Sequence, residues 1–196
     1  MKLLFIRHGE TLGNAEKRYI GITDENLSRD GKVKLKTLIK NASYPTADRV
    51  YTSSLKRATQ TAELIYPGVA AVRVSDFREC DFGDFEGRNY VELNGDPSYQ
   101  IWIDSGGEMK FPNGESRAEL SDRVILAFEK IMKTLYLKGA ECTAFVVHKG
   151  TIMSIMDRYA KPERPYFDWS MQNGHGFICE AENWVANKIL IFKKEL

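Results

Sequence analysis

The stretch that decides the fold is KLLFIRHGET, residues 2–11. It contains a continuous apolar run, Leu3 to Ile6, which ends at the charged side chain of Arg7. A short apolar run that ends in charge is typical of a strand buried inside a sheet. His8 therefore sits just past the end of a predicted strand.

Further strands and helices alternate along the chain, as the spacing of apolar residues indicates. Strands are expected at residues 49–51, 69–74 and 143–147. Helices are expected at residues 28–41, at 54–66 with Ser54 at its start, at 116–135 with a capping box of Ser116 and Glu119, and around 152–159. Two late strands, near residues 176–181 and 184–192, are expected to form a closing hairpin.

Alternation of strands with helices predicts a three-layer α/β/α fold with a mostly parallel central sheet. The chain has 196 residues, with no internal repeat and no linker-like composition, which predicts a single domain over residues 1–196. Between residues 76 and 114 the periodicity is lost, and glycines alternate with aromatic residues. We expect this excursion to be a lid or a substrate loop.

Composition excludes several classes of protein. Apolar residues make up 43% and charged residues 28%, as in ordinary globular proteins, and the net charge of +1 argues against nucleic-acid binding. No apolar run reaches the ~20 residues of a membrane span, and the first run is far shorter than a signal-peptide core. Cys80, Cys142 and Cys179 form no CxxC pair, so we expect free thiols in a reducing cytoplasm. The oligomeric state stays open.

The chemistry-bearing residues cluster after predicted strands. There is no Walker A sequence and no GxGxxG, and no spacing of histidines and carboxylates suggests a metal site, so we expect no metal and no cofactor. His8 follows one strand and His148 follows another. Ligands of such sheets bind beyond the carboxyl ends of the strands. Arg57, near the start of the helix expected at residues 54–66, could reach the same edge of the sheet. These residues point to a small anionic ligand.

Four motifs, in this order, resemble the histidine phosphatase superfamily, also called phosphoglycerate-mutase-like. The motifs are RHGET (7–11), SSLKRATQTA (53–62), FRECDFGDFEG (77–87) and VVHKG (146–150). The resemblance covers essentially the whole chain and implies the phosphoglycerate-mutase-like fold. It also implies an enzyme that acts on a small phosphorylated metabolite.

The resemblance implies a role for each matching residue. His8 corresponds to the nucleophile that becomes phosphohistidine, which requires that its other ring nitrogen donate to a fixed acceptor. Arg7 and Arg57 correspond to the guanidiniums that bind the phosphoryl group, Asn14 to an amide donor, and His148 to the second histidine.

Further implied roles fall on the acidic segment and on the second histidine motif. Glu79 corresponds to the proton donor for the departing alcohol, since a carboxyl that faces a phosphate dianion keeps its proton more readily. Backbone amides near Lys149 and Gly150, at a helix start, would add donors to the phosphate. Lys149 departs from the usual His-Gly-Gly pattern, although a backbone amide survives that change.

The family contains both phosphatases and mutases, and three features favour a phosphatase. The acidic segment is of the phosphatase type, the chain is shorter than the cofactor-dependent mutases, and Ile20 stands where those mutases have a small polar residue. Residues 111–116, FPNGES, are similar to the α-ribazole phosphatase branch. A broad-specificity sugar-phosphate phosphatase and a phosphoglycerate mutase remain alternatives, and a non-catalytic scaffold is disfavoured because every catalytic position is occupied.

Overall fold

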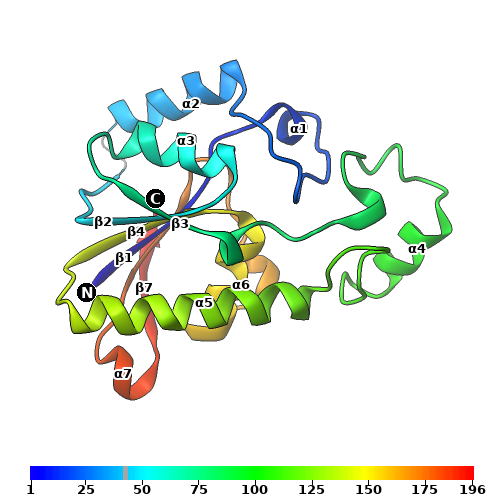
Figure 1. The fold of residues 1–196 in the computed structure, drawn as a ribbon. Helices are drawn as coiled ribbons and strands as arrows, with labels where there is room; N and C mark the ends of the chain where they lie inside the picture. Colours follow the sequence, from blue (N-terminus) through cyan, green and yellow to red (C-terminus); the bar gives the residue numbers. More distant parts are fainter. Residues whose placement is uncertain (42–43) are drawn as a thin grey trace.

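A central sheet of seven strands organises the molecule (Figure 1). The computed structural model describes residues 1–41 and 44–196. The strands are β1 (Lys2–Arg7), β2 (Arg49–Ser53), β3 (Ala71–Val74), β4 (Cys142–Val147), β5 (Ala160–Lys161), β6 (Gly176–Glu180) and β7 (Leu190–Glu195). Their order across the sheet is β3-β2-β4-β1-β6-β7-β5, and only β6 runs against the others.

Helices cover both faces of this sheet (Figure 1). They are α1 (Leu12–Ala15), α2 (Arg29–Lys40), α3 (Lys56–Ile65), α4 (Pro97–Asp104), α5 (Arg117–Leu137), α6 (Lys149–Tyr159) and α7 (Trp184–Asn187). Three short 3-10 turns are η1 (Ser75–Phe77), η2 (Gly83–Phe85) and η3 (Tyr166–Trp169). Helices α2 and α3 lie on one face, and α5 and α6 lie on the other. The predicted three-layer α/β/α fold with a mostly parallel sheet is confirmed.

Two hydrophobic clusters hold the three layers together. Successive side chains of a strand point to opposite faces, so Leu3 and Phe5 pack towards α5 and α6, whereas Leu4 and Ile6 pack towards α2 and α3. All four side chains are fully buried. This two-sided burial explains why the strand reads as a continuous apolar run rather than as an alternating pattern.

Helix starts follow the predicted caps with one exception. The hydroxyl of Ser28 accepts the N–H of Gly31 at the start of α2, and Ser116 forms the expected capping box with Glu119 at the start of α5. The prediction that Ser54 opens the next helix is wrong. The residue before α3 is Leu55, whose own N–H is bound by the hydroxyl of Ser53.

The late hairpin differs from its prediction in one strand. Strands β6 and β7 pair antiparallel, but residues 184–187 form α7, and the second strand begins only at Leu190. Asn183 and Lys188, on either side of α7, adopt left-handed backbone conformations that close this short helix. The detour places Trp184 in the core, where its ring lies 4.9 Å from that of Tyr159.

The excursion of residues 76–114 contains the helix α4, which the lost periodicity did not reveal. Asp96 caps this helix and Pro97 occupies its first turn, but none of its residues is buried. Only Tyr99 and Trp102 of this helix pack against the core, and both are half-buried, so the helix leaves no clear apolar stripe in the sequence. Figure 1 shows the excursion extending on the side of the molecule where α1 lies. In the described part of the chain, no helix is both long and apolar enough to span a bilayer.

Replacing Phe145 by alanine should destabilise the fold strongly. The ring is fully buried in β4 and lies 5.4 Å from the rings of both Phe5 and Phe128. We expect Phe145→Ala to lower the free energy of unfolding by about 3–5 kcal/mol, as measured by urea denaturation. The control Leu137→Ala removes a side chain that is 77% exposed, and it should change stability by about 0.5 kcal/mol or less. Equal effects of the two variants would contradict this description of the core.

Candidate active site

Two histidines meet at the carboxyl ends of neighbouring strands. Strands β1 and β4 pair in parallel, with Arg7 opposite Val147. The next residue on each strand is a histidine, and the rings of His8 and His148 lie edge to face with their centroids 5.0 Å apart. The register of one strand pair therefore brings together residues that are far apart in the sequence.

The surroundings of His8 determine which of its two ring nitrogens carries the hydrogen and which carries the lone pair. Its Nδ1 lies 2.7 Å from the carbonyl oxygen of Gly9, and since that oxygen only accepts, Nδ1 carries the hydrogen. Burial lowers the pKa of His8 well below its ordinary value, and the charges of Arg57 and Arg7 lower it further. The imidazole is therefore neutral at pH 7, with the lone pair on Nε2.

Two side chains that the sequence analysis did not single out hold the backbone around His8. The hydroxyl of Thr61, in α3, accepts the N–H of Gly9 at 2.9 Å. The amide nitrogen of Asn173 donates to the carbonyl oxygen of His8 at 3.0 Å. Thr61 lies inside the SSLKRATQTA motif, which was a usable signal, whereas nothing in the sequence distinguishes Asn173.

Arg7 and Arg57 lie beside the two histidines. Arg57 is fully buried and donates to the carbonyl oxygens of Gly21 and Thr23, each at 2.7 Å. Arg7 donates to the carbonyl oxygen of Met171 at 2.9 Å. Burial is the main cause that lowers the pKa of each guanidinium from its ordinary value, and both remain protonated at neutral pH. The Nε of each arginine is buried, with no partner among residues 1–41 and 44–196.

His148 is completely buried, and neither of its ring nitrogens has a hydrogen-bond partner in the described part of the chain. Burial is the main cause that lowers its pKa well below the ordinary value. The electrostatic effects of Arg57, His8 and Arg7 lower the pKa further, in that order. Polar atoms are rarely buried without partners, because each one loses its bonds to water. Such atoms beside His8 are the arrangement expected of a site that binds a polar ligand.

Glu79 reaches the site from the irregular segment between η1 and η2. Its side chain accepts the N–H of Cys80 at 3.0 Å and the N–H of Gly150 at 3.2 Å. A Cβ atom at position 150 would lie only 2.3 Å from Oε1 of Glu79, so only glycine allows this approach. The Gly150 amide, predicted as a phosphate donor, thus holds the carboxylate in this structure.

Asn14 lies in α1 at the edge of the site. Its amide oxygen accepts the side-chain N–H of Asn173 at 3.0 Å and the backbone N–H of Thr11 at 3.3 Å. Because the oxygen is the acceptor in both bonds, the NH2 group of Asn14 is left to donate elsewhere. Of the other acids of this region, Glu86 binds the backbone N–H groups of Gly21 and Thr23 and is structural.

A pocket of about 290 Å³ opens beside these residues. Its polar end is lined by Arg7, His8, Asn14, Glu79, Lys149 and Gly150. Arg57 and His148 are fully buried and do not line the pocket, although the ring centroid of His148 lies 5.0 Å from that of His8. The rest of the lining includes six aromatic side chains, those of Tyr19, Phe82, Trp102, Phe111, Tyr166 and Phe167, together with the two cations Arg18 and Arg117 and with Ile20, Cys80, Gly107, Leu120 and Met153. Three of the aromatic residues, Phe82, Trp102 and Phe111, come from the excursion of residues 76–114.

Lys149 places a cation beside the polar end of the pocket. Burial lowers the pKa of its ammonium group, and the charge of Arg7 acts in the same direction. His175, in contrast, bonds through its ring to the carbonyl oxygen of Leu196 and has a structural role. Within the described ranges, no three His, Cys, Asp or Glu side chains are grouped so as to hold a metal ion.

Comparison with known proteins identifies the family. The model of the histidine phosphatase superfamily (branch 1) matches residues 3–184. A phosphoglycerate mutase-like protein 4 of Arabidopsis thaliana is 32% identical over 168 residues, which cover 82% of this chain and 71% of that protein. Phosphoserine phosphatase 1 of Hydrogenobacter thermophilus is 30% identical over 137 residues, or 68% of this chain and 65% of the relative.

The fold agrees with this result. The crystal structure of the α-ribazole phosphatase from Shigella flexneri superimposes with a TM-score of 0.84 over 98% of this chain and 95% of that one, at 22% identity. The chain therefore belongs to the histidine phosphatase superfamily, and the predicted family and phosphatase class of enzyme are confirmed.

The buried histidines should make stability depend on pH. Because the pKa values of His8 and His148 are lowered in the folded state, the unfolded chain takes up protons below about pH 6.5 that the folded chain does not. We expect the free energy of unfolding to fall as the pH falls from 7 to 5. The slope of the free energy of unfolding against pH counts the protons taken up on unfolding. His148→Asn should reduce that slope by about one proton, as measured by denaturation curves at several pH values. An unchanged slope would contradict the lowered pKa of His148.

Proposed function

We propose that this protein hydrolyses phosphate monoesters of small metabolites through a phosphohistidine on Nε2 of His8. The observation that carries the proposal is the set of buried, unpartnered nitrogens beside that lone pair. These are both ring nitrogens of His148 and the Nε atoms of Arg7 and Arg57. A phosphoryl group supplies acceptors for the single N–H of neutral His148 and for the two arginine Nε–H groups, and two negative charges for the guanidiniums.

The reaction begins when the phosphoryl oxygens bind Arg7, Arg57, His148 and the NH2 group of Asn14. Nε2 of His8 then attacks phosphorus as the bond between phosphorus and the alcohol oxygen breaks. Phosphoryl transfer has little covalent work for the protein beyond this step, so positioning and charge stabilisation supply most of the rate.

Glu79 completes the cycle in two steps. Its carboxyl group gives a proton to the departing alcohol oxygen, so that an alcohol rather than an alkoxide leaves. The resulting carboxylate takes a proton from a water molecule as that water attacks the phosphohistidine. The bond between His8 and phosphorus breaks, inorganic phosphate leaves, and both residues return to their starting states.

The aromatic wall supports an alcohol with an apolar, planar part. A three-carbon acid such as phosphoglycerate fills little of a pocket lined by six aromatic side chains, whereas a planar ring stacks on them. We therefore propose α-ribazole phosphate as the substrate to test first. The excursion of residues 76–114 then acts as the substrate loop of one domain that spans residues 1–196.

Two alternatives are tested beside it. The mutase-like name of the Arabidopsis relative favours a test with 3-phosphoglycerate, and a panel of sugar phosphates tests for broad specificity. The free thiols of Cys80, Cys142 and Cys179 suit a reducing compartment, and we propose the cytoplasm as the place of the reaction. We propose no nucleic-acid or membrane partner.

Removing His8 should abolish both turnover and the covalent intermediate. We expect wild-type protein, mixed with labelled p-nitrophenyl phosphate and quenched rapidly, to carry an acid-labile, base-stable phosphoryl group. His8→Ala should carry none and should lose activity by about four orders of magnitude or more. Labelling that persists in His8→Ala would contradict the assignment of the nucleophile.

Shortening Trp102 should weaken binding of aromatic substrates alone. This half-buried side chain lines the pocket beside Phe111. We expect Trp102→Ala to raise KM for α-ribazole phosphate about tenfold, which corresponds to roughly 1.5 kcal/mol of lost aromatic contact. KM for glycerol phosphate should stay within about twofold. The control Tyr90→Ala removes an exposed aromatic residue of the same excursion outside the pocket lining, and it should change neither value.

A further inference from the structure

The segment that carries Glu79 has no regular structure of its own. It lies between η1 and η2, and residues 78–82 belong to neither a helix nor a strand. Its backbone groups therefore have no ladder of bonds and need partners from elsewhere. A proton donor must nevertheless be held within about 0.5 Å of its working position. Something outside the segment has to supply that rigidity.

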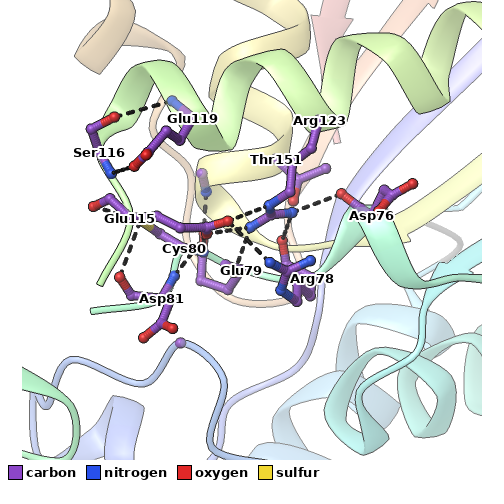
Figure 2. Close-up of polar contacts among 12 residues, drawn as sticks. Asp76, Arg78, Glu79, Cys80, Asp81, Glu115, Ser116, Glu119, Arg123 and Thr151 are labelled. Atoms are coloured by element: carbon purple, nitrogen blue, oxygen red, sulfur yellow. Dashed lines mark hydrogen bonds and ion pairs between the residues drawn. The ribbon is translucent and has the colours of Figure 1, made fainter. Parts of the chain in front are cut away.

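Arg123 supplies it from the first half of α5 (Figure 2). Its guanidinium has five N–H groups, and the structure shows five hydrogen bonds. Two go to the carboxylate oxygens of Glu115, at 2.8 and 2.7 Å. The other three go to the backbone carbonyl oxygens of Asp76, Arg78 and Glu79, at 2.7, 2.9 and 2.9 Å.

Glu115 extends the same contact to the other side of Glu79. One of its carboxylate oxygens accepts the N–H of Asp81 at 3.0 Å, and its own N–H donates to the carbonyl oxygen of Asp81 at 2.8 Å. Its other carboxylate oxygen also accepts from the guanidinium of Arg78. Arg123 and Glu115 thus bind the chain before, at and after Glu79, as Figure 2 shows.

The pair is well placed to act as a rigid support. The side chains of Arg123 and Glu115 are only 14% and 16% exposed, so solvent screens their attraction little. Burial raises the pKa of Glu115, but the bonds from Arg123 and from the N–H of Asp81 outweigh it and lower the pKa below its ordinary value. The carboxylate is therefore ionised, and α5 is anchored nearby through the buried side chain of Val124.

We propose that the Arg123–Glu115 pair is the positioning device for Glu79. The inference rests on the proposed role of Glu79 as proton donor. Neither member of the pair lines the pocket, so both act through the backbone that carries Glu79. Lysine cannot replace Arg123 in this role, because an ammonium group has three donors and lacks the planar fork that binds a carboxylate and three carbonyls together.

The test compares two substrates that differ in their need for a proton. p-Nitrophenolate leaves p-nitrophenyl phosphate without protonation, whereas the alkoxide that leaves benzyl phosphate needs a proton. The parameter kcat/KM reports only the steps up to departure of the alcohol. We expect Arg123→Lys and Glu115→Gln to lower kcat/KM for benzyl phosphate by about 10- to 100-fold. For p-nitrophenyl phosphate the loss should be about threefold or less.

A matched control and a thermal measurement separate positioning from loss of fold. Glu129→Gln removes an ion pair with Lys188 elsewhere on α5, and it should leave both substrates unchanged. Each variant is also melted, and its active fraction is counted by the phosphoryl label that it forms. Equal losses on the two substrates after correction for active fraction would mean a structural role only, and would overturn the inference.

A double-mutant cycle identifies the group through which the pair acts. If Arg123 acts by positioning Glu79, its replacement should have no effect once Glu79 is already replaced. The double variant Arg123→Lys/Glu79→Gln should then have the same kcat/KM for benzyl phosphate as Glu79→Gln alone. Additive losses would overturn the inference while leaving the role of Glu79 intact. A Glu79→Gln variant that slows both substrates equally would instead reject the proposed proton donor, and the inference with it.

Discussion

The backbone ladder between β1 and β4 brings the two candidate catalytic histidines together. Both strands are buried on two faces, so a shift in their register would expose apolar side chains and would separate His8 from His148. The register of β1 and β4 therefore determines both the packing of the core and the relative positions of His8 and His148. Residues in β1 and β4 that never touch a ligand still decide whether the two imidazoles face each other.

Charge and burial act together at that strand end. Burial lowers the pKa of both imidazoles, the charges of Arg57 and Arg7 lower it further, and both rings are therefore held in the neutral form, which is the form that can attack phosphorus. The Nε atoms of Arg7 and Arg57 are buried without a partner among the described residues, although both guanidiniums donate to backbone carbonyl oxygens through their other nitrogens. The phosphate dianion of the proposed reaction would supply acceptors and negative charge to these groups.

Sequence patterns predicted the elements with buried faces and missed those without one. The continuous run before His8 and the capping box of Ser116 were readable because each reflects a local physical need. Helix α4 was missed since it buries no residue, and the start of α3 was misplaced since Leu55 lacks a side-chain cap. The histidines and arginines were found by motif, whereas Arg123 and Asn173 act on backbone atoms, and such contacts leave no periodic signal.

The residues that line the pocket come from different parts of the fold, and this limits which of them can change during evolution. Of the proposed reacting groups, Arg7, His8, Arg57 and His148 lie at strand ends or on α3, whereas Glu79 and three of the aromatic side chains come from the excursion, whose helix α4 has no buried residue. Substitutions at exposed positions of α4 cost little folding energy, whereas Phe85, Leu93 and Phe111 of the same excursion are buried in the core. If the proposed function holds, we expect lineages to exchange one alcohol for another mainly by substitution on α4, where Trp102 lines the pocket, while Glu79 and the residues at the strand ends stay unchanged.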